Sequence, residues 1–233
     1  MSVKIYLLDV TGLRQESAAE KKEFECLCER LSGERQKKIR QFRHAKGRAL
    51  SLGAGLLLDY GLSRYGLRER DVAMVYGADE KPYLRDYPEL FFNLSHSGTM
   101  AMAAFSEQEI GCDVEQIAVP DMRVVYRFFA ADEARRIEEA ARTGEQAEYF
   151  YRFWTLKESF LKVTGRGIRM PLNEFCIHLG EPIQVEQDGE ILDYGFAEFA
   201  CPGYRMAYCT ERAKSEKEEK PEFLSWEQIW GIN

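Results

Sequence analysis

Apolar positions along this chain follow two spacings, the two-residue period of strands and the three-to-four-residue period of amphipathic helices. In the first half, the pattern predicts strands over residues 4–9, 72–76, 91–94, 100–105 and 110–115, with helices over residues 18–31 and 34–60. Leucines crowd the end of the second helix, and Gly61 is its expected stop. Residues 83–90 show neither period, so we expect a loop there.

The second half of the chain repeats this alternation. It predicts a short helix after Pro120, helices over residues 132–142 and 145–163, and strands over residues 175–179, 183–186, 191–198 and 204–209. Gly165 and Gly167 are expected to end the last helix. The charged residues 214–222 are expected to be mobile, whereas residues 223–230 have the helical apolar spacing of a segment that docks on the body.

The order of elements predicts an α+β fold with two lobes of similar size that meet near residue 110. We take residues 1–108 as an N-terminal α+β lobe, residues 109–213 as a C-terminal α+β lobe, and residues 214–233 as a charged tail. With 233 residues, 45% of them hydrophobic, the chain is long enough to bury a core. No apolar run approaches the roughly 18 residues of a membrane span, and the N-terminus resembles a strand rather than a signal peptide. We therefore expect a soluble, cytoplasmic protein with no membrane partner.

Charge and cysteine content narrow the function. Thirty-nine acidic and 32 basic residues give a net charge of −7, which argues against a nucleic-acid-binding surface but leaves room for a local basic pocket. The six cysteines include no CxxC pair and no zinc-site spacing, which fits reduced thiols. Positive charge is densest in ERQKKIRQFRHAKGR, residues 34–48, where a solvated helix face is the alternative to a phosphate-binding patch.

Two acidic residues of the segment GCDVEQ, residues 111–116, stand two positions apart on a predicted strand. Side chains at this spacing point to the same face, so Asp113 and Glu115 would project together. Two carboxylates make a hard-oxygen site that suits Mg²⁺ with waters and substrate phosphates. The alternative is a solvated acid pair at a strand end.

The segment FWTLKESFLKVTGRG, residues 153–167, places Trp154, Glu158 and Lys162 on one face of a predicted helix, beside an apolar stripe. Glu158 is a candidate third metal ligand or base, and Lys157 and Lys162 are candidate phosphate contacts. The alternative is an ordinary amphipathic helix in which Glu158 and Lys162 form an i,i+4 pair.

The segment FNLSHSG, residues 92–98, brings hydroxyls and an imidazole close to a turn. Hydroxyl, imidazole and backbone N–H groups together suit a phosphate. A nucleophilic serine is disfavoured, because Ser95 and His96 are adjacent on a strand and point to opposite faces, and no GxSxG elbow is present. The alternative is a turn beside a buried, hydrogen-bonded histidine.

Taken in order, FNLSHSG, GCDVE and WTLKESFLKVTGRG resemble the signatures of the Sfp-type 4′-phosphopantetheinyl transferases, which are FNxSHS, GxDxE and a WxxKE helix with a further lysine and a GKG-like end. The resemblance extends from Ile5 to about Tyr208. It implies two α+β lobes related by a pseudo-twofold axis, with coenzyme A bound in the cleft between them.

The resemblance also implies an activity. Such an enzyme transfers the 4′-phosphopantetheine arm of coenzyme A to a serine of an apo acyl, peptidyl or aryl carrier protein and releases adenosine 3′,5′-bisphosphate. The carrier would belong to fatty-acid, polyketide or nonribosomal peptide synthesis. Because one chain already supplies both lobes, a monomer is expected.

Residue roles follow from the same resemblance. Asp113, Glu115 and Glu158 would bind Mg²⁺, with Mn²⁺ as the alternative ion, and Glu158 would also be the base, directly or through a water. Lys157 and Lys162 would contact the diphosphate, and Lys162 would protonate or stabilise the leaving group. The coenzyme A phosphates would be held by Ser95 and His96, and the 3′-phosphate by Arg35, Lys38, Ser51 and Lys81. Glu80 stands where the family usually has a glycine before the Lys-Pro pair, which weakens the case for Lys81.

Two rival functions use the same residues differently. One is a non-catalytic protein of this fold that binds coenzyme A and a carrier, against which the full set Asp113, Glu115, Glu158 and Lys162 argues. The other is a Mg²⁺-dependent phosphohydrolase, which would place water where the carrier serine attacks.

Overall fold

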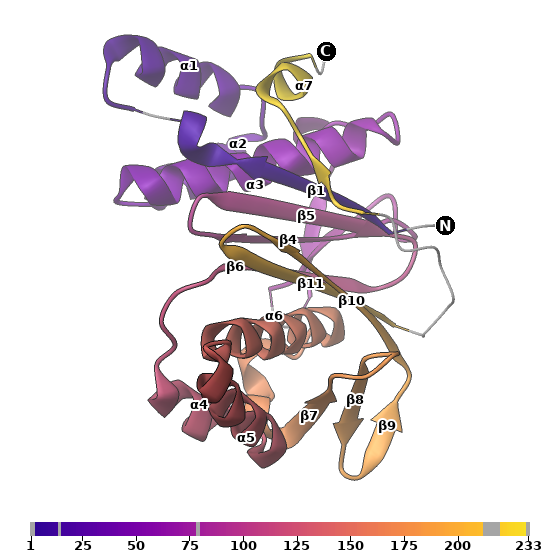
Figure 1. The fold of residues 1–233 in the computed structure, drawn as a ribbon. Coiled ribbons are helices and arrows are strands. Elements are labelled where there is room, and N and C mark those ends of the chain that lie inside the picture. The colour runs from indigo at the N-terminus through magenta and orange to yellow at the C-terminus, as the bar shows by residue number, and fades with distance from the viewer. Residues whose placement is uncertain (1–2, 14, 78–79, 212–219, 232–233) are drawn as a thin grey trace.

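The protein is described here by a computed structural model that covers residues 3–13, 15–77, 80–211 and 220–231. Two lobes lie one above the other, each with helices on its outer side and a sheet on its inner side (Figure 1). The two sheets face each other at the middle of the molecule. None of the described helices combines the length and the apolar character needed to cross a membrane.

The N-terminal lobe is built on a four-stranded sheet with the order β12-β1-β5-β4. Its strands are β1 (Lys4–Asp9), β4 (Phe91–Ser97), β5 (Met100–Ser106) and β12 (Glu222–Phe223). The helices of this lobe are α1 (Ala18–Cys28), α2 (Gly33–Gln41), α3 (Ala45–Ser63) and α7 (Trp226–Trp230), and a hairpin is formed by β2 (Met74–Tyr76) and β3 (Pro82–Leu84). The long helix α3 packs on β1, β4 and β5.

The C-terminal lobe is built on a three-stranded sheet with the order β10-β11-β6. Its strands are β6 (Ile110–Gln116), β10 (Tyr194–Cys201) and β11 (Tyr204–Glu211), and its helices are α4 (Met122–Phe128), α5 (Ala131–Ala140) and α6 (Gln146–Thr164). A separate small sheet is formed by β7 (Phe175–His178), β8 (Gln184–Gln187) and β9 (Glu190–Leu192). The long helix α6 packs on β6 and β11.

The two lobes repeat one topology. In each, a first strand leads to a helix of 19 residues and then to an antiparallel hairpin whose second strand pairs with the first strand. The N-terminal series is β1, α3, β4, β5, and the C-terminal series is β6, α6, β10, β11. The α+β, two-lobed fold expected from the sequence is therefore the fold observed.

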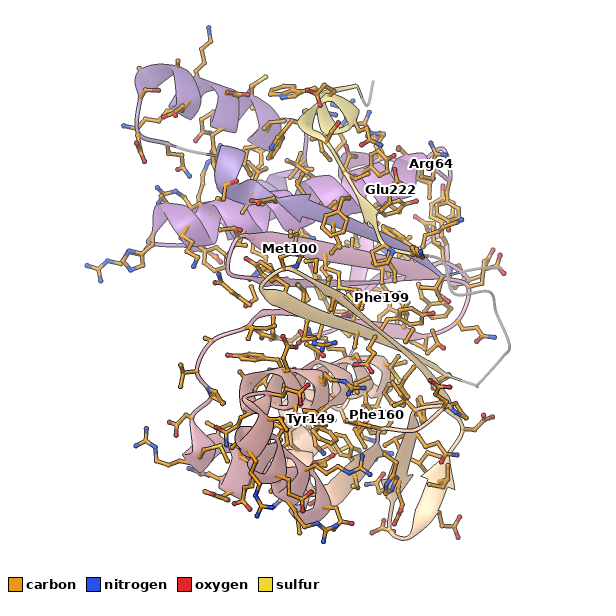
Figure 2. All side chains as sticks on the ribbon, in the orientation of Figure 1. Arg64, Met100, Tyr149, Phe160, Phe199 and Glu222 are labelled. Atoms are coloured by element: carbon orange, nitrogen blue, oxygen red, sulfur yellow. The ribbon has the colours of Figure 1, made fainter. Side chains whose placement is uncertain are left out.

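A shared core joins the lobes. One apolar cluster lies inside each lobe, and a third lies between the two sheets. The third cluster includes Ile5 and Met102 from the sheet of the N-terminal (upper) lobe and Val114 and Met206 from the sheet of the C-terminal (lower) lobe. Figure 2 labels Met100 and Phe199 in this middle layer. Because each sheet buries this face against the other, neither lobe has a complete core alone.

The predicted helix over residues 34–60 is two helices, which is a correction. α2 ends at Gln41 and α3 begins at Ala45, with the chain extended at Phe42. The Arg48 guanidinium donates hydrogen bonds to the carbonyls of Phe42 and Arg43, at 3.3 and 3.2 Å, and so satisfies carbonyls that the break frees. The break turns the basic helix α2 against α3.

The expected helix stop at Gly61 is also wrong. α3 continues to Ser63, and a Cβ at Gly61 would lie 2.0 Å from the Phe105 ring. Glycine is present there because the helix approaches the sheet closely, not because the helix ends.

Smaller differences concern strand boundaries and the end of the chain. Part of the predicted loop at residues 83–90 is strand β3, and the predicted strand over residues 191–198 is split between β9 and β10. The mobility expected of residues 214–222 falls mostly outside the described residues. Residues 222–230 pack on the N-terminal lobe as β12 and α7, so this part of the chain docks on the body.

Candidate active site

A cavity of about 450 Å³ opens where the two lobes meet. Its walls come from α2 and α3 of the upper lobe, from β4 and β6, and from α6 of the lower lobe. The lining residues are Arg35, Lys38, Phe42, Ser51, Ala54, Leu94, Ser95, His96, Asp113, Glu115, Trp154, Glu158 and Lys162. Every site residue predicted from the sequence lies here except Lys81 and Lys157. A second cavity of about 250 Å³ shares Arg35, Lys38 and Leu94 with the first.

Asp113 occupies the inner end of the cavity and is almost fully buried. Its Oδ1 accepts hydrogen bonds from Ser95 Oγ at 2.8 Å and from Lys162 Nζ at 2.7 Å. Its Oδ2 is buried without a hydrogen-bond partner among the described residues. A buried carboxylate oxygen without a partner is costly, so this atom is available to a ligand.

Two more carboxylates, Glu115 and Glu158, line the cavity beside Asp113. Burial raises the pKa of both, and the negative charge of Asp113 raises each pKa further. Three carboxylates around one space repel one another, and a bound cation would relieve that repulsion. The arrangement therefore favours a positively charged ligand.

Lys162 is the cation that the structure already places among these carboxylates. Its Nζ donates to Asp113 Oδ1, to the Cys112 carbonyl at 3.0 Å and to Ser95 Oγ at 3.2 Å. Burial acts to lower the pKa of Lys162, but the attraction of Asp113 and other acidic groups leaves it above the ordinary value. The ammonium is therefore charged at neutral pH.

A glycine brings α6 close enough to β6 for these contacts. A Cβ on Gly111 would lie 2.1 Å from the Ser159 carbonyl oxygen and 2.5 Å from the Val163 nitrogen, both of them backbone atoms of α6. No other residue fits at this position without moving the helix. The glycine of GCDVE thus allows Glu158 and Lys162 to reach Asp113.

The outer part of the cavity is basic. Lys38 and Arg35 reach it from α2, and burial together with the Arg35 charge lowers the pKa of Lys38. The ring of His96 reaches solvent, yet partial burial and the charges of Lys162 and Lys38 lower its pKa. An exposed ring at the rim of a cavity is inconsistent with the buried structural histidine that was the alternative for His96.

A carboxylate-rich inner end and a basic outer end suit a metal and phosphates. Comparison with known proteins points to one family. A family model described as the 4′-phosphopantetheinyl transferase superfamily matches residues 109–209. The chain is 30% identical to the 4′-phosphopantetheinyl transferase Sfp of Bacillus subtilis (strain 168), over 95% of this chain and 100% of that protein. It is 31% identical to the 4′-phosphopantetheinyl transferase ffp of Bacillus subtilis, over 88% of this chain and 93% of that one.

The chain belongs to the Sfp-type 4′-phosphopantetheinyl transferases. Among solved structures, the holo-[acyl-carrier-protein] synthase of Thermotoga maritima aligns with a TM-score of 0.34 and 17% identity, covering 46% of this chain and 64% of that one.

Lys157 of this transferase lies away from the cavity, contrary to its predicted diphosphate contact. It is fully buried, and its Nζ donates to the carbonyls of Leu172 and Phe175, at 2.8 and 2.7 Å, and pairs with Glu133 at 2.9 Å. Glu133 in turn accepts the backbone N–H of Ile177. The ammonium's hydrogen bonds are thus used to tie α6 to α5 and β7.

Lys81 also lies outside the main cavity, contrary to its predicted contact with the 3′-phosphate. Its Nζ pairs with Glu109 at 2.5 Å and donates to the carbonyl of Ile110 at 3.0 Å. It also contacts the Val163 carbonyl at the end of α6, at 3.4 Å. In this transferase Lys81 joins the β2–β3 hairpin to the lower lobe.

Ser95 lines the cavity but has no hydrogen left for a phosphate. A hydroxyl carries one donor and two acceptor sites. Ser95 Oγ donates to Asp113 and accepts from Lys162 and from the Val114 N–H. Its predicted phosphate contact would require it to release Asp113.

The cavity region also contains residues that the sequence did not mark as site residues. The Trp154 side chain hydrogen-bonds to Glu115, and Ser97 Oγ donates to Glu115 Oε2 at 2.5 Å. Their signal was present, since Trp154 lies four residues before Glu158 on the same helix face and Ser97 ends FNLSHS. Phe42, Ala54 and Leu94 are apolar wall residues for which spacing gives no signal.

The donor set fits a hard divalent cation. Carboxylate oxygens are the protein ligands that Mg²⁺ prefers, and Asp113 Oδ2 is a buried oxygen without a partner. Within the described part of the chain, no three His, Cys, Asp or Glu side chains already converge as a metal cluster. Waters and substrate phosphates usually complete the shell of Mg²⁺, so a site assembled only with substrate is consistent with this geometry.

Proposed function

We propose that this protein transfers the 4′-phosphopantetheine arm of coenzyme A to a serine hydroxyl of an apo acyl, peptidyl or aryl carrier protein. The observation that carries the proposal is a single cavity between the lobes with three carboxylates and Lys162 at one end and Arg35, Lys38 and His96 at the other. Coenzyme A has matching parts, a diphosphate and a separate 3′-phosphate.

The basic end of the cavity binds the adenosine phosphates in this proposal. Arg35 and Lys38 attract the 3′-phosphate from α2, and the buried hydroxyl of Ser51 is a further donor on α3. His96, on β4 at this same end of the cavity, contacts a phosphate oxygen. These contacts set the diphosphate against the carboxylate end.

The reaction forms one bond and breaks one. The carrier serine oxygen attacks the phosphorus that bears the pantetheine arm, and the bond from that phosphorus to the bridging oxygen breaks. Adenosine 3′,5′-bisphosphate leaves with the bridging oxygen, and Lys162 stabilises the charge that develops there. Glu158 accepts the proton of the serine hydroxyl, and the raised pKa of its carboxyl group makes it a better base.

Asp113, Glu115 and Glu158 would hold Mg²⁺ or Mn²⁺. Bound there, the ion would offset the charge of the diphosphate and orient it. Asp113 keeps one oxygen on Lys162 and leaves the other free for this purpose.

Mass spectrometry of apo carriers tests the proposal. The protein is incubated with coenzyme A, Mg²⁺ and, in turn, an acyl, a peptidyl and an aryl apo carrier. We expect at least one carrier to gain the mass of one phosphopantetheine arm, and expect Asp113→Asn, which keeps the side-chain volume, to lose this gain. Binding of coenzyme A without any gain on any carrier would favour the non-catalytic alternative. Breakdown of coenzyme A without a carrier would favour hydrolysis.

A further inference from the structure

The facing edges of the two sheets lie side by side but are not joined as a sheet. β4 is an edge strand of the upper sheet and pairs with β5, and β6 is an edge strand of the lower sheet and pairs with β11. Among the described residues, no backbone ladder connects β4 to β6. The N–H groups of β6 that face β4 therefore need hydrogen-bond partners other than a neighbouring backbone.

Side chains of β4 provide those partners at every second position. The N–H of Cys112 donates to Asn93 Oδ1 at 3.0 Å, that of Val114 to Ser95 Oγ at 3.4 Å, and that of Gln116 to Ser97 Oγ at 3.2 Å. Each pair is separated by 19 residues, so the two strands run in the same direction. We call this row of bonds the seam.

The two hydroxyls of the seam also donate hydrogen bonds to carboxylates. Ser95 Oγ donates to Asp113 Oδ1, and Ser97 Oγ donates to Glu115 Oε2 at 2.5 Å. Each serine accepts from one β6 amide and directs its hydrogen to the carboxylate just before that amide. The seam thus connects the joint between the lobes to the orientation of both carboxylates.

We infer that Ser97 is a positioning residue for cation binding, because its hydroxyl fixes the Glu115 carboxylate against the seam. This inference rests on the proposed function, in which Glu115 is a metal ligand. Ser97 separates this role from others better than Ser95 does, since Ser95 also contacts Lys162. Without the Ser97 hydroxyl, Glu115 loses one charge-assisted bond while its bond to the Trp154 side chain remains, and repulsion from Asp113 shifts the carboxylate from the orientation that the seam sets.

The test compares Ser97→Ala, Ser97→Thr and the matched control Asn93→Ala. Asn93 belongs to the same seam, but the bonds described for its side chain include none to a carboxylate. Mn²⁺ binding is measured by electron paramagnetic resonance on the full chain with coenzyme A and no carrier, so that the readout does not depend on transfer. Melting temperatures are measured in parallel.

We expect Ser97→Ala to weaken Mn²⁺ binding about 10- to 100-fold, as is typical when a partner that orients a metal ligand is removed. Ser97→Thr keeps the hydroxyl and should restore the affinity. Asn93→Ala should lower the melting temperature without this loss of affinity.

Two results would overturn the inference. One is unchanged Mn²⁺ affinity in Ser97→Ala, and the other is an equal loss in Asn93→Ala, which would assign the effect to the seam as a whole. If the wild-type protein binds no Mn²⁺ while the carrier still gains its arm, the metal site and the inference both fail but the transfer function stands.

Discussion

His96 combines solvent access with a lowered pKa. Partial burial, and then the neighbouring Lys162 and Lys38, lower the pKa of the imidazole below its ordinary value of 6.5, so the ring is mostly neutral at pH 7 in the free protein. A bound phosphate dianion favours the protonated ring and raises this pKa. Binding of coenzyme A should therefore take up a proton and should tighten as the pH falls from 8 to 6.

The variant His96→Ala isolates this effect from the titration of coenzyme A itself. We expect a loss of affinity of about 10- to 150-fold at pH 6, the value of a hydrogen bond to a charged group, and a smaller loss at pH 8. Isothermal titration calorimetry in two buffers of different ionisation enthalpy measures both the affinity and the proton uptake. If the affinity for coenzyme A depended on pH in the same way in the wild type and the variant, His96 would not be a phosphate contact.

Lys157 shows that a motif residue can serve the structure rather than the substrate. Lys157→Met leaves Glu133 buried without its cation, a change that costs about 3–5 kcal/mol when one partner of a buried ion pair is removed. Urea unfolding should show this loss, and the double variant Glu133→Gln/Lys157→Met should recover part of it. The KM for coenzyme A should stay near the wild-type value in the folded protein. A large rise in the KM for coenzyme A with unchanged stability would show instead that Lys157 contacts the phosphates.

At the scale of elements, the contact between α6 and β6 decides the geometry of the carboxylates. Gly111→Ala puts a methyl group into the backbone of α6, which must move away. Overpacking of this kind typically costs about 1–3 kcal/mol. We also expect a fall in kcat, because Glu158 and Lys162 move with the helix.

The matched control is Gly33→Ala in the first turn of α2, where a Cβ meets nothing within 4 Å. Thermal melting and transfer kinetics on both variants separate a general effect of glycine replacement from the effect of this contact. Wild-type kinetics in Gly111→Ala would mean that transfer does not depend on the close approach of α6 to β6.

The terminal elements β12 and α7 stabilise the upper lobe. β12 lies parallel to β1 and covers its edge, and Ile229 of α7 is fully buried in the upper core. Ile229→Ala should cost about 2–5 kcal/mol, whereas Glu227→Ala, on the exposed side of α7, should be close to neutral. Circular dichroism melting compares the two, and equal melting temperatures would contradict a structural role for this segment.

For the molecule as a whole, the core between the sheets predicts that the lobes unfold together. Met102 lies in this middle cluster and is fully buried. Met102→Ala should cost about 2–5 kcal/mol and should shift the unfolding of both lobes equally.

Tryptophan fluorescence can follow each lobe separately. Trp154 lies in the lower lobe, while Trp226 and Trp230 lie in α7 of the upper lobe. Chains that keep one set and carry phenylalanine at the other report each lobe during urea unfolding. Coincident midpoints in both chains are expected, and separate midpoints would show lobes that fold independently.

Periodicity predicted the parts of the fold in which each element's own residues decide the outcome. The strand predicted over residues 4–9 is β1, and the helix predicted over residues 145–163 is α6 at Gln146–Thr164. The break before α3 was missed, because it depends on Arg48 reaching carbonyls five and six residues earlier. No apolar period records such a contact.

The candidate site shows the same division. Strand and helix spacing placed Asp113, Glu115, Glu158 and Lys162 on the correct faces, and these residues meet in one cavity. Spacing could not show that Lys157 meets Glu133 of another helix, or that Lys81 meets Glu109. Which charges become buried with a partner depends on contacts between distant elements, and a face assignment contains no information about them.

The seam has a consequence for how much of this chain can be replaced. In an ordinary strand pair the peptide groups make the bonds, so the joint tolerates almost any side chain that suits the pleat. Here the N–H groups of β6 instead bond to one side-chain amide and two hydroxyls at alternate positions of β4. The joint is therefore specified by particular amino acids rather than by the backbone, which makes residues 93–97 a poor place for a designer to vary the sequence.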